Sequence, residues 1–288
     1  MLKYFYNVES GGVVYSVDMI RIHFEMKDTS MSNLHKIIEN NFRYEYFSSY
    51  GAFSYRNLFT INLSNGGVVS IGTSLNGLKS ADFKRCFIEF NPNKCLPSNE
   101  FYNLYGFIVQ YSIDLFLSRF DFAIDIPLPR QNFILVKDQR IYKVVAKSLK
   151  TGNYSEYLGE RNKNGYVKLY NKKHESGLDY ELTRLEITLD SFDYELCKKA
   201  MPKVYVPKNV DMYTMFNLKE TELVLLNYLM ADTQSSMINF LKLGRKMQQK
   251  LKPFLFGDYE FVDFDANLFS KIKYFYEDYL CLKNKRIS

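Results

Sequence analysis

The stretch RFDFAID at positions 119–125 decides how this chain folds, because polar and apolar residues alternate along it. Successive side chains of a β-strand point to opposite faces of the sheet. The two phenylalanines and Ile124 therefore share one face, whereas Arg119, Asp121 and Asp125 share the other. This stretch predicts a strand with one face buried in a core and one face that carries charge.

Two later stretches, YVKLYNK (166–172) and TRLEITL (183–189), alternate in the same way. Their polar faces carry Lys168, Tyr170, Lys172, Arg184 and Glu186. Few Thr, Ser or Gln residues, which usually fill a plain solvent face, accompany them. The three strands predict one charged sheet face.

Strand-like and helix-like segments alternate along the rest of the chain. The first set predicts a strand at 13–26, a helix at 31–42, further strands up to residue 91 and a helix at 101–117. The pattern then restarts with the strand at 119–127, a helix at 138–149 and strands at 153–160, 164–172 and 180–189. We expect an α+β fold in which helices cover one face of a large, mainly antiparallel sheet, with a ferredoxin-like duplication as an option.

In the C-terminal third, apolar residues recur every three or four positions. This spacing predicts helices at 218–230, 234–255 and 266–283. Pro202 and Pro207 mark a linker between the two parts. We therefore expect a catalytic α+β domain at 1–205 and a helical DNA-binding or accessory region at 206–288.

Composition excludes several classes of protein. A chain of 288 residues that is 47% hydrophobic can bury a core without disulfides or structural metals. The four cysteines are widely spaced and form no C-x-x-C pair, which argues against a zinc site and fits a reducing bacterial cytoplasm. The N-terminus lacks the pattern of a signal peptide, and the apolar stretch 101–117 is too short and too polar to span a membrane.

Positive charge is concentrated in two segments. Residues 137–173 hold ten Lys or Arg against three acids, and Arg161, Lys163, Lys168 and Lys173 are among the ten. A second basic segment runs from Lys242 to Lys252 and includes Arg245 and Lys246. Such segments attract polyanions, of which nucleic acid is the commonest. An ordinary solvated helix face is the alternative for each segment.

The charged sheet face has two interpretations. Cross-strand ion pairs, such as Arg119 with Glu186, would make it purely structural. Alternatively, Asp121 and Glu186 hold Mg²⁺ or Mn²⁺, which prefer oxygen ligands, and the basic side chains hold phosphate. In that case Tyr170 is a nucleophile for phosphoryl transfer, and we expect the neighbouring lysines and the cation to lower its pKa.

The ordered motifs resemble the replication initiation factors of rolling-circle plasmids and phages, together with related conjugative relaxases. The motifs are RFDFAID (119–125), YLGER (157–161), KLYNKKHE (168–175) and RLEI (184–187). The resemblance implies a Rep/relaxase-like nuclease in which a tyrosine attacks DNA, stays linked to the 5′ phosphate and frees a 3′ hydroxyl primer. The segment LGRKMQQKLKPFL (243–255) also resembles the C-terminal region of that family.

The resemblance implies that Tyr170 is the nucleophile and that Asp121 and Glu186 are the metal ligands. Lys172, Arg119 and Arg184 then stabilise phosphate or phenolate. Lys163 stands where the family often has Ser, and some members carry a tyrosine at the position of His174. Tyr180 is the fallback nucleophile. The His-hydrophobic-His metal motif of other rolling-circle initiators is absent from the sequence.

Three functions follow as hypotheses. The first is a rolling-circle initiator that nicks an origin with a hairpin and a single-stranded nick site. The second is a conjugative relaxase with the same chemistry, and the third is a DNA-binding regulator without catalysis. A host helicase and a homodimer are partners implied only by the resemblance, and no membrane is expected.

Overall fold

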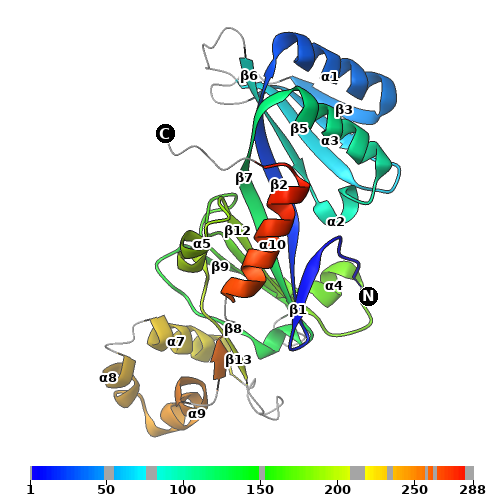
Figure 1. The fold of residues 1–288 in the computed structure, drawn as a ribbon. Coiled ribbons are helices and arrows are strands. Elements are labelled where there is room, and N and C mark those ends of the chain that lie inside the picture. The colour runs from blue at the N-terminus through cyan, green and yellow to red at the C-terminus, as the bar shows by residue number, and fades with distance from the viewer. Residues whose placement is uncertain are drawn as a thin grey trace.

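A single large antiparallel sheet dominates the structure, a computed structural model that describes residues 2–48, 55–75, 83–148, 153–207, 218–231, 236–256, 259–261 and 265–282. The sheet has eleven strands in the order β3-β4-β5-β6-β2-β7-β12-β11-β10-β9, with β1 paired to β2 (Figure 1). All the pairs are antiparallel. The expected α+β class is confirmed.

The elements of the first half surround the long strand β2. They are β1 (Asn7–Ser10), β2 (Val13–Lys27), α1 (Asp28–Asn41), β3 (Arg43–Ser48), β4 (Tyr55–Asn62), β5 (Val68–Leu75), β6 (Phe83–Phe90), α2 (Pro92–Cys95) and α3 (Asn99–Tyr111). Helix α3 begins where the Ser98 side chain accepts a hydrogen bond from the Phe101 amide, the usual role of an N-cap serine. It ends at Tyr111, and the chain continues as β7, so the predicted helix end at 117 is wrong.

The second half surrounds β7 in the same way. Its elements are β7 (Ser112–Ile126), η1 (Arg130–Asn132), β8 (Ile134–Leu135), β9 (Tyr142–Ser148), β10 (Asn153–Leu158), β11 (Val167–Asn171), α4 (Lys172–Ser176), β12 (Thr183–Leu189) and α5 (Tyr194–Ala200). Within the main sheet, each half is a long strand followed by four strands, the last of which returns beside the first. This repeated strand order agrees with a duplicated unit, and the two long strands join the halves.

The helix predicted at 138–149 is wrong over its described residues, because Tyr142–Ser148 forms strand β9; residue 149 lies outside the described part of the chain. Val144 and Val145 are β-branched and favour an extended chain. Strand β10 also needs a hydrogen-bonding partner on its outer side, which β9 supplies. Consequently the second half has η1 and β8 at the place where the first half has helix α1, and the ferredoxin-like unit is not repeated in full.

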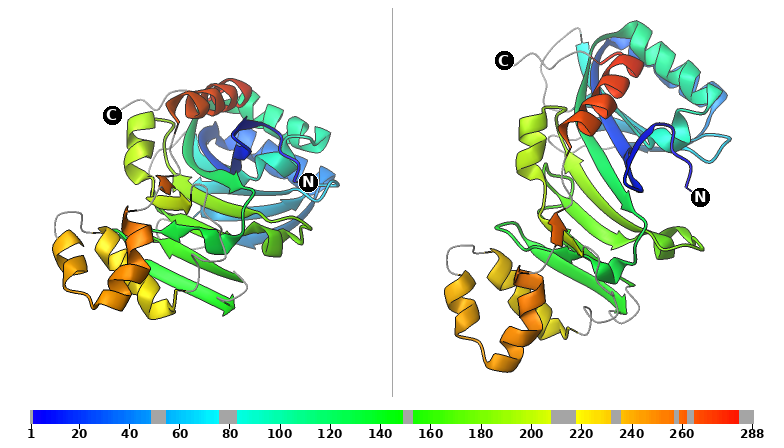
Figure 2. Two further views of the ribbon diagram at one scale, coloured as in Figure 1. Left: turned by 90° about the horizontal axis from the view of Figure 1, so that it is seen from below. Right: turned by 60° about the horizontal axis from the view of Figure 1, so that its bottom comes forward.

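Helices α1, α3, α5 and α10 cover one face of the sheet (Figure 2). The apolar faces predicted for the strands lie against them: Phe120, Phe122, Ile124, Leu185 and Ile187 are all at most 1% exposed. Each such side chain contributes about 1.5–3 kcal/mol by leaving water. The opposite face of the sheet is left free for polar side chains.

The C-terminal region contains β13 (Val204–Pro207), α7 (Glu220–Ala231), α8 (Ser236–Leu241), α9 (Arg245–Phe256), β14 (Tyr259–Phe261) and α10 (Ala266–Tyr279). Helices α7, α8 and α9 pack around Leu226, Leu229 and Leu251, a small core to which Val136 also belongs. The single helix predicted at 234–255 is two helices, with Gly244 between them. Strands β14, β13 and β8 form a separate small sheet.

Helix α10 packs elsewhere, because Phe269, Ile272 and Tyr276 belong to the main core. The division at residue 205 stays a prediction, yet the packing assigns α10 to the larger part. Among the described residues, no helix is long and apolar enough to cross a membrane.

Candidate active site

Strands β7, β12 and β11 bring the predicted polar residues together on the free face of the sheet. Lys168 pairs in register with Glu186, Tyr170 with Arg184, and Thr188 with Asp121. Neighbouring strands lie about 5 Å apart, so these side chains stand next to one another. The charged face predicted from the alternation is therefore present.

A pocket of about 620 Å³ opens on this face. The predicted residues that line it are Arg119, Asp121, Arg161, Lys168, Tyr170 and Glu186. His174, which the motif comparison had noted, lines it as well, and the other lining residues are Asp18, Met19, Arg21, Glu89, Asn153, Ser155, Tyr157, Asn162, Tyr166, Asn171, Glu175 and Thr188. The pocket is thus polar, with carboxylates and guanidinium groups on facing strands.

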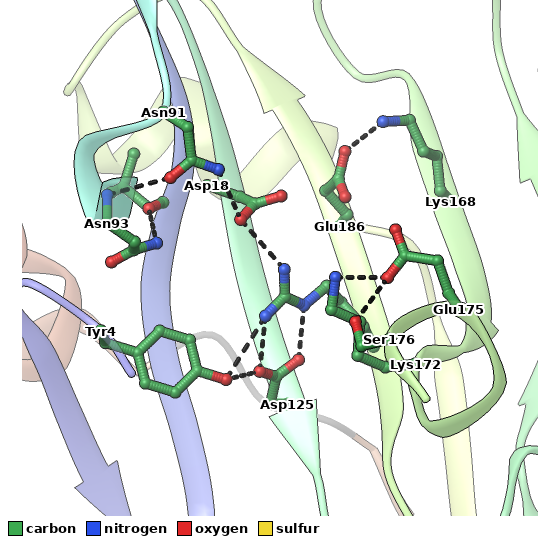
Figure 3. Close-up of polar contacts among 12 residues, drawn as sticks. Tyr4, Asp18, Asn91, Asn93, Asp125, Lys168, Lys172, Glu175, Ser176 and Glu186 are labelled. Carbon is green, nitrogen blue, oxygen red and sulfur yellow. Dashed lines mark hydrogen bonds and ion pairs between the residues drawn. The ribbon is translucent and has the colours of Figure 1, made fainter. Parts of the chain in front are cut away.

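Tyr170, Glu186 and Lys168 form the centre of the pocket. The Tyr170 hydroxyl donates a hydrogen bond of 3.2 Å to Glu186 Oε2. Lys168 Nζ is bonded to Oε1 of the same carboxylate (Figure 3). Glu186 is only 4% exposed. A tyrosine hydroxyl is therefore held directly against a buried carboxylate that could accept its proton.

The pKa of Tyr170 lies above its ordinary value, which corrects the expectation that it is lowered. Burial of the phenol is the main cause, and the Glu186 charge adds to it, while Arg184 opposes both. Without substrate the phenolate is disfavoured. Attack by this oxygen therefore requires that its proton be removed as the new bond forms.

Burial raises the pKa of Glu186 as well. Lys168 opposes the rise, whereas the charges of Asp121 and Asp18 add to it. A carboxylate with a raised pKa is a stronger base than a free one. The pKa of Lys168 is raised by Glu186 despite its own burial, so the lysine stays charged.

Arg119 and Asp121 form the wall next to this centre. Arg119 Nη2 lies 3.3 Å from Asp121 Oδ2, and Nη1 donates to Asn162 Oδ1 at 3.1 Å. Asp121 Oδ1 accepts a hydrogen bond of 2.7 Å from Thr188. The ion pair expected between Arg119 and Glu186 is not the one that forms, because Lys168 is the ion-pair partner of Glu186.

Arg184 does not line the pocket, contrary to its predicted role on phosphate. It is 2% exposed and makes two bonds to Asp125, of 2.6 Å from Nε and 2.7 Å from Nη2 (Figure 3). Its Nη1 lies 3.1 Å from Asp18 Oδ1, and Nη2 donates to the Tyr4 hydroxyl. All three guanidinium nitrogens are engaged, so Arg184 is placed to hold the strands rather than to bind phosphate.

Lys172 lies at the start of α4 and is turned toward Glu175, with 2.5 Å between Nζ and Oε2. Its Nζ lies 5.7 Å from the centre of the Tyr170 ring, yet the residue is buried and does not line the pocket. His174 lines the pocket with Nε2 3.1 Å from the Asn153 amide nitrogen. Tyr180 lies away from the pocket and accepts a hydrogen bond from the Leu2 amide.

The predicted DNA-binding residues other than Lys168 fall into four places. Arg161 lines the pocket, whereas Lys163 is exposed in the adjoining turn and Lys173 is paired with Glu181 at 2.5 Å. Arg245 and Lys246 are exposed at the start of α9. Among described residues neither of these two has an ion pair.

The carboxylates of the pocket are the oxygen donors to weigh against the predicted metal ion. Within the described part of the chain, no group of three or more His, Cys, Asp or Glu side chains is arranged to hold a metal ion. Asp121 and Glu186 do lie on the same wall, and Asp121 and Asp18 each raise the pKa of Glu186. This mutual repulsion of carboxylates is what a bound cation would relieve, so the oxygen donors fit Mg²⁺ or Mn²⁺ with water and phosphate as further ligands.

Asp18 is the most informative residue that the sequence analysis missed. It sits in β2 where the register with β7 shifts between Val17 and Met19, and this bulge turns it toward Arg184. The regular alternation of the strand does not reveal a bulge. Arg21 and Glu89, by contrast, alternate with apolar residues and could have been found as a cross-strand pair.

Comparison with known proteins gives the following relatives. No family model matches this chain. Three proteins of Staphylococcus aureus, each named replication initiation protein, are 32%, 29% and 31% identical over 124, 122 and 124 residues. The matches cover 39–40% of this chain and 38–40% of each relative, so the chain spans about two fifths of the length of these relatives.

Among solved structures, the rolling circle replication initiator protein from Geobacillus stearothermophilus is similar over 65% of this chain and 80% of that chain. The identity is 16% and the TM-score is 0.39, which is too low to establish a shared fold. The sequence matches agree with the resemblance stated for the motifs: over 122–124 residues this chain is similar to proteins named replication initiation protein.

Proposed function

We propose that this protein initiates rolling-circle replication by nicking one strand of origin DNA with Tyr170. The observation that carries the proposal is the hydrogen bond from the Tyr170 hydroxyl to Glu186 in an open polar pocket. The similarity to replication initiation proteins supports DNA as the substrate. A conjugative relaxase would use the same chemistry on a different DNA site.

The reaction is a transesterification. Glu186 Oε2 takes the Tyr170 proton while the phenol oxygen forms a bond to the scissile phosphorus. The bond from phosphorus to the 3′ oxygen breaks, and that oxygen leaves as a hydroxyl after taking a proton from water. The protein is then joined to the 5′ phosphate, and the free 3′ hydroxyl is the primer.

Arg119, Arg161 and Lys168 supply positive charge around the phosphate. Negative charge grows on the phosphate oxygens as the tyrosine attacks, and fixed cations in a partly buried site stabilise it. Arg119 is held by Asp121 and Asn162, so it is oriented before the DNA arrives. Tyr170 requires this arrangement because its own pKa is raised.

Asp121 and Glu186 would hold Mg²⁺ or Mn²⁺, with Asp18 beside them. When bound, such an ion supplies Lewis-acid stabilisation of phosphate charge. Both carboxylates already have partners, Tyr170 and Lys168 for Glu186 and Arg119 and Thr188 for Asp121, so the ion would compete with these contacts.

A nicking assay tests the proposal. The protein is incubated with Mg²⁺ or Mn²⁺ and a supercoiled plasmid that carries the DNA flanking its reading frame. We expect a nicked circle with protein joined to the 5′ end, found as a band that shifts on a denaturing gel and is lost with protease.

Tyr170→Phe is expected to lose the adduct entirely while Tyr180→Phe keeps it. Nicking by Tyr170→Phe would show that another residue is the nucleophile. If neither variant nor the unmodified protein forms an adduct but duplex DNA is bound, the protein is a DNA-binding regulator. Asp121→Asn is expected to raise the metal concentration needed for nicking and to leave DNA binding near its original strength.

A further inference from the structure

Two tyrosines at one end of the pocket have no part in the proposed chemistry. Tyr157 of β10 and Tyr166, just before β11, both line the pocket. Their rings are nearly parallel, with an angle of 11° between the planes and 6.2 Å between the centres. Among the residues that the structure describes, neither phenol hydroxyl has a hydrogen-bond partner. Since these hydroxyls make no hydrogen bond in the described part of the chain, the aromatic ring faces are the surfaces available to a ligand in the pocket.

The surroundings of this pair carry the charges that a nucleic acid strand needs. The charges of Lys168, Arg161 and Glu186 all act on the phenol of Tyr166, whose pKa burial raises. Arg119 reaches Asn162 in the same turn. Aromatic rings beside basic side chains are the means by which proteins hold single-stranded DNA, with bases stacked on the rings and phosphates on the cations.

The turn that joins β10 to β11 holds both rings in place. Gly159, Asn162 and Gly165 have φ of 86°, 66° and 78°, which folds the chain back within a few residues. The Tyr166 carbonyl accepts a hydrogen bond of 2.8 Å from the Thr188 amide, and its amide donates to the Lys163 carbonyl. Tyr157 is paired in register with Lys168. These contacts fix the backbone that carries the two rings, on the same sheet face as Tyr170 and with Lys168 between Tyr166 and Tyr170 along that face.

From these contacts we infer that Tyr157 and Tyr166 form a stacking subsite for an unpaired base beside the scissile phosphate. This inference rests on the proposed function and adds to it a subsite, built from two tyrosine rings, that holds one unpaired base of the single-stranded nick site. Stacking needs the ring and not the hydroxyl. It accepts any base, because every base has a flat aromatic face.

The test uses the Tyr170→Phe protein, which binds without reacting, and oligo(dT) carrying one 2-aminopurine at successive positions. The protein has no tryptophan, so the fluorescence of the probe is free of protein background. We expect strong quenching at one or two adjacent positions only. Tyr157→Ala and Tyr166→Ala should each remove that quenching and weaken binding by about 5-fold to 100-fold.

Phenylalanine at either position should keep both the quenching and the affinity, because the ring remains. Tyr274→Ala is the control, since Tyr274 is 75% exposed on α10 over the other face of the sheet. Uniform quenching, or equal loss with Phe and Ala, would overturn the stacking subsite. If the unmodified protein still forms the covalent adduct in that case, the proposed function is kept and only the stacking subsite is rejected. If it forms no adduct and binds no oligo(dT), the proposed function fails too.

Discussion

At the scale of single residues, Glu186 connects the stability of the site to its chemistry. It holds Tyr170 with one oxygen and Lys168 with the other, and burial raises its pKa. Arg184, two residues earlier on the same strand face, is fully engaged with carboxylates. One of these residues is placed to react and the other to hold the strands together.

The nicking rate should depend on pH through Glu186. A protonated carboxyl cannot accept the tyrosine proton, so the rate is low in acid and rises as pH passes the Glu186 pKa. Because that pKa is raised, we expect the midpoint above the ordinary value of about 4.3. A single-turnover measurement of adduct formation against pH checks this. Glu186→Gln should be inactive at every pH, whereas Glu181→Gln, at an exposed pair, should keep the original profile.

Replacing Arg184 should destabilise the fold strongly. Arg184→Ala leaves buried Asp125 without its partner, and breaking a buried ion pair costs about 3–5 kcal/mol. Lys173→Ala breaks an exposed pair with Glu181 and should cost about 0–1 kcal/mol. Urea unfolding gives both free energies. Equal small losses would show that Arg184 is not a structural residue.

At the scale of elements, the turn between β10 and β11 shapes the pocket. Gly159 has φ of 86°, and a Cβ there would lie 3.3 Å from the Gly165 carbonyl oxygen. Only glycine combines that φ with such close approach of another part of the backbone. The motif YLGER therefore has a glycine for conformational reasons, and the turn carries Arg161 into the pocket.

Gly159→Ala should lower the free energy of unfolding and nicking together. The left-handed conformation alone costs a residue with a Cβ about 1–2 kcal/mol. Gly177→Ala is the matched control, because it has φ of 64° and open space around the added Cβ. We expect a larger loss at Gly159 in urea unfolding. Nicking should fall only with Gly159→Ala, because Gly177 does not line the central pocket.

At the scale of the whole molecule, the pocket and the α7–α9 helices belong to parts built around different hydrophobic clusters, the second of which also takes in Val136. The pocket lies on the free face of the large sheet, and α9 begins with Arg245 and Lys246 exposed to solvent. This arrangement fits a division of labour in which the sheet cleaves DNA and the helices hold the flanking duplex.

Charge reversal on α9 should weaken duplex binding without changing the chemistry. The double variant R245E/K246E should lower duplex affinity and reduce the slope of log K against log salt by about 2. The control K198E/K199E removes as much charge from α5, where both lysines are exposed. Fluorescence anisotropy at several salt concentrations measures the slopes. If the variant's nicking rate on a short single strand falls as much as its duplex affinity does, the proposed division between a cleaving sheet and DNA-holding helices is contradicted.

The sequence predicted the centre of the fold better than its edges. Alternation along β7, β11 and β12 placed Asp121, Tyr170 and Glu186 on one face, because a strand exposes every second residue whatever lies around it. The prediction of secondary structure failed at 138–149, where a periodic apolar pattern fits a helix as well as a strand. Strand pairing with β10 settles that choice, and pairing joins residues far apart in the chain.

What the sequence determined by itself is the polarity of each strand face and the order of the motifs. The tertiary structure decided which charges meet: Glu186 with Lys168 and Tyr170, and Arg184 with Asp125 and Asp18. It also decided the pKa of Tyr170, which the neighbouring lysines alone would lower but which burial and Glu186 raise. The physical reason is that alternation is a local property of the backbone, whereas burial and ion pairing depend on strand register, on bulges such as that at Asp18, and on what covers each face.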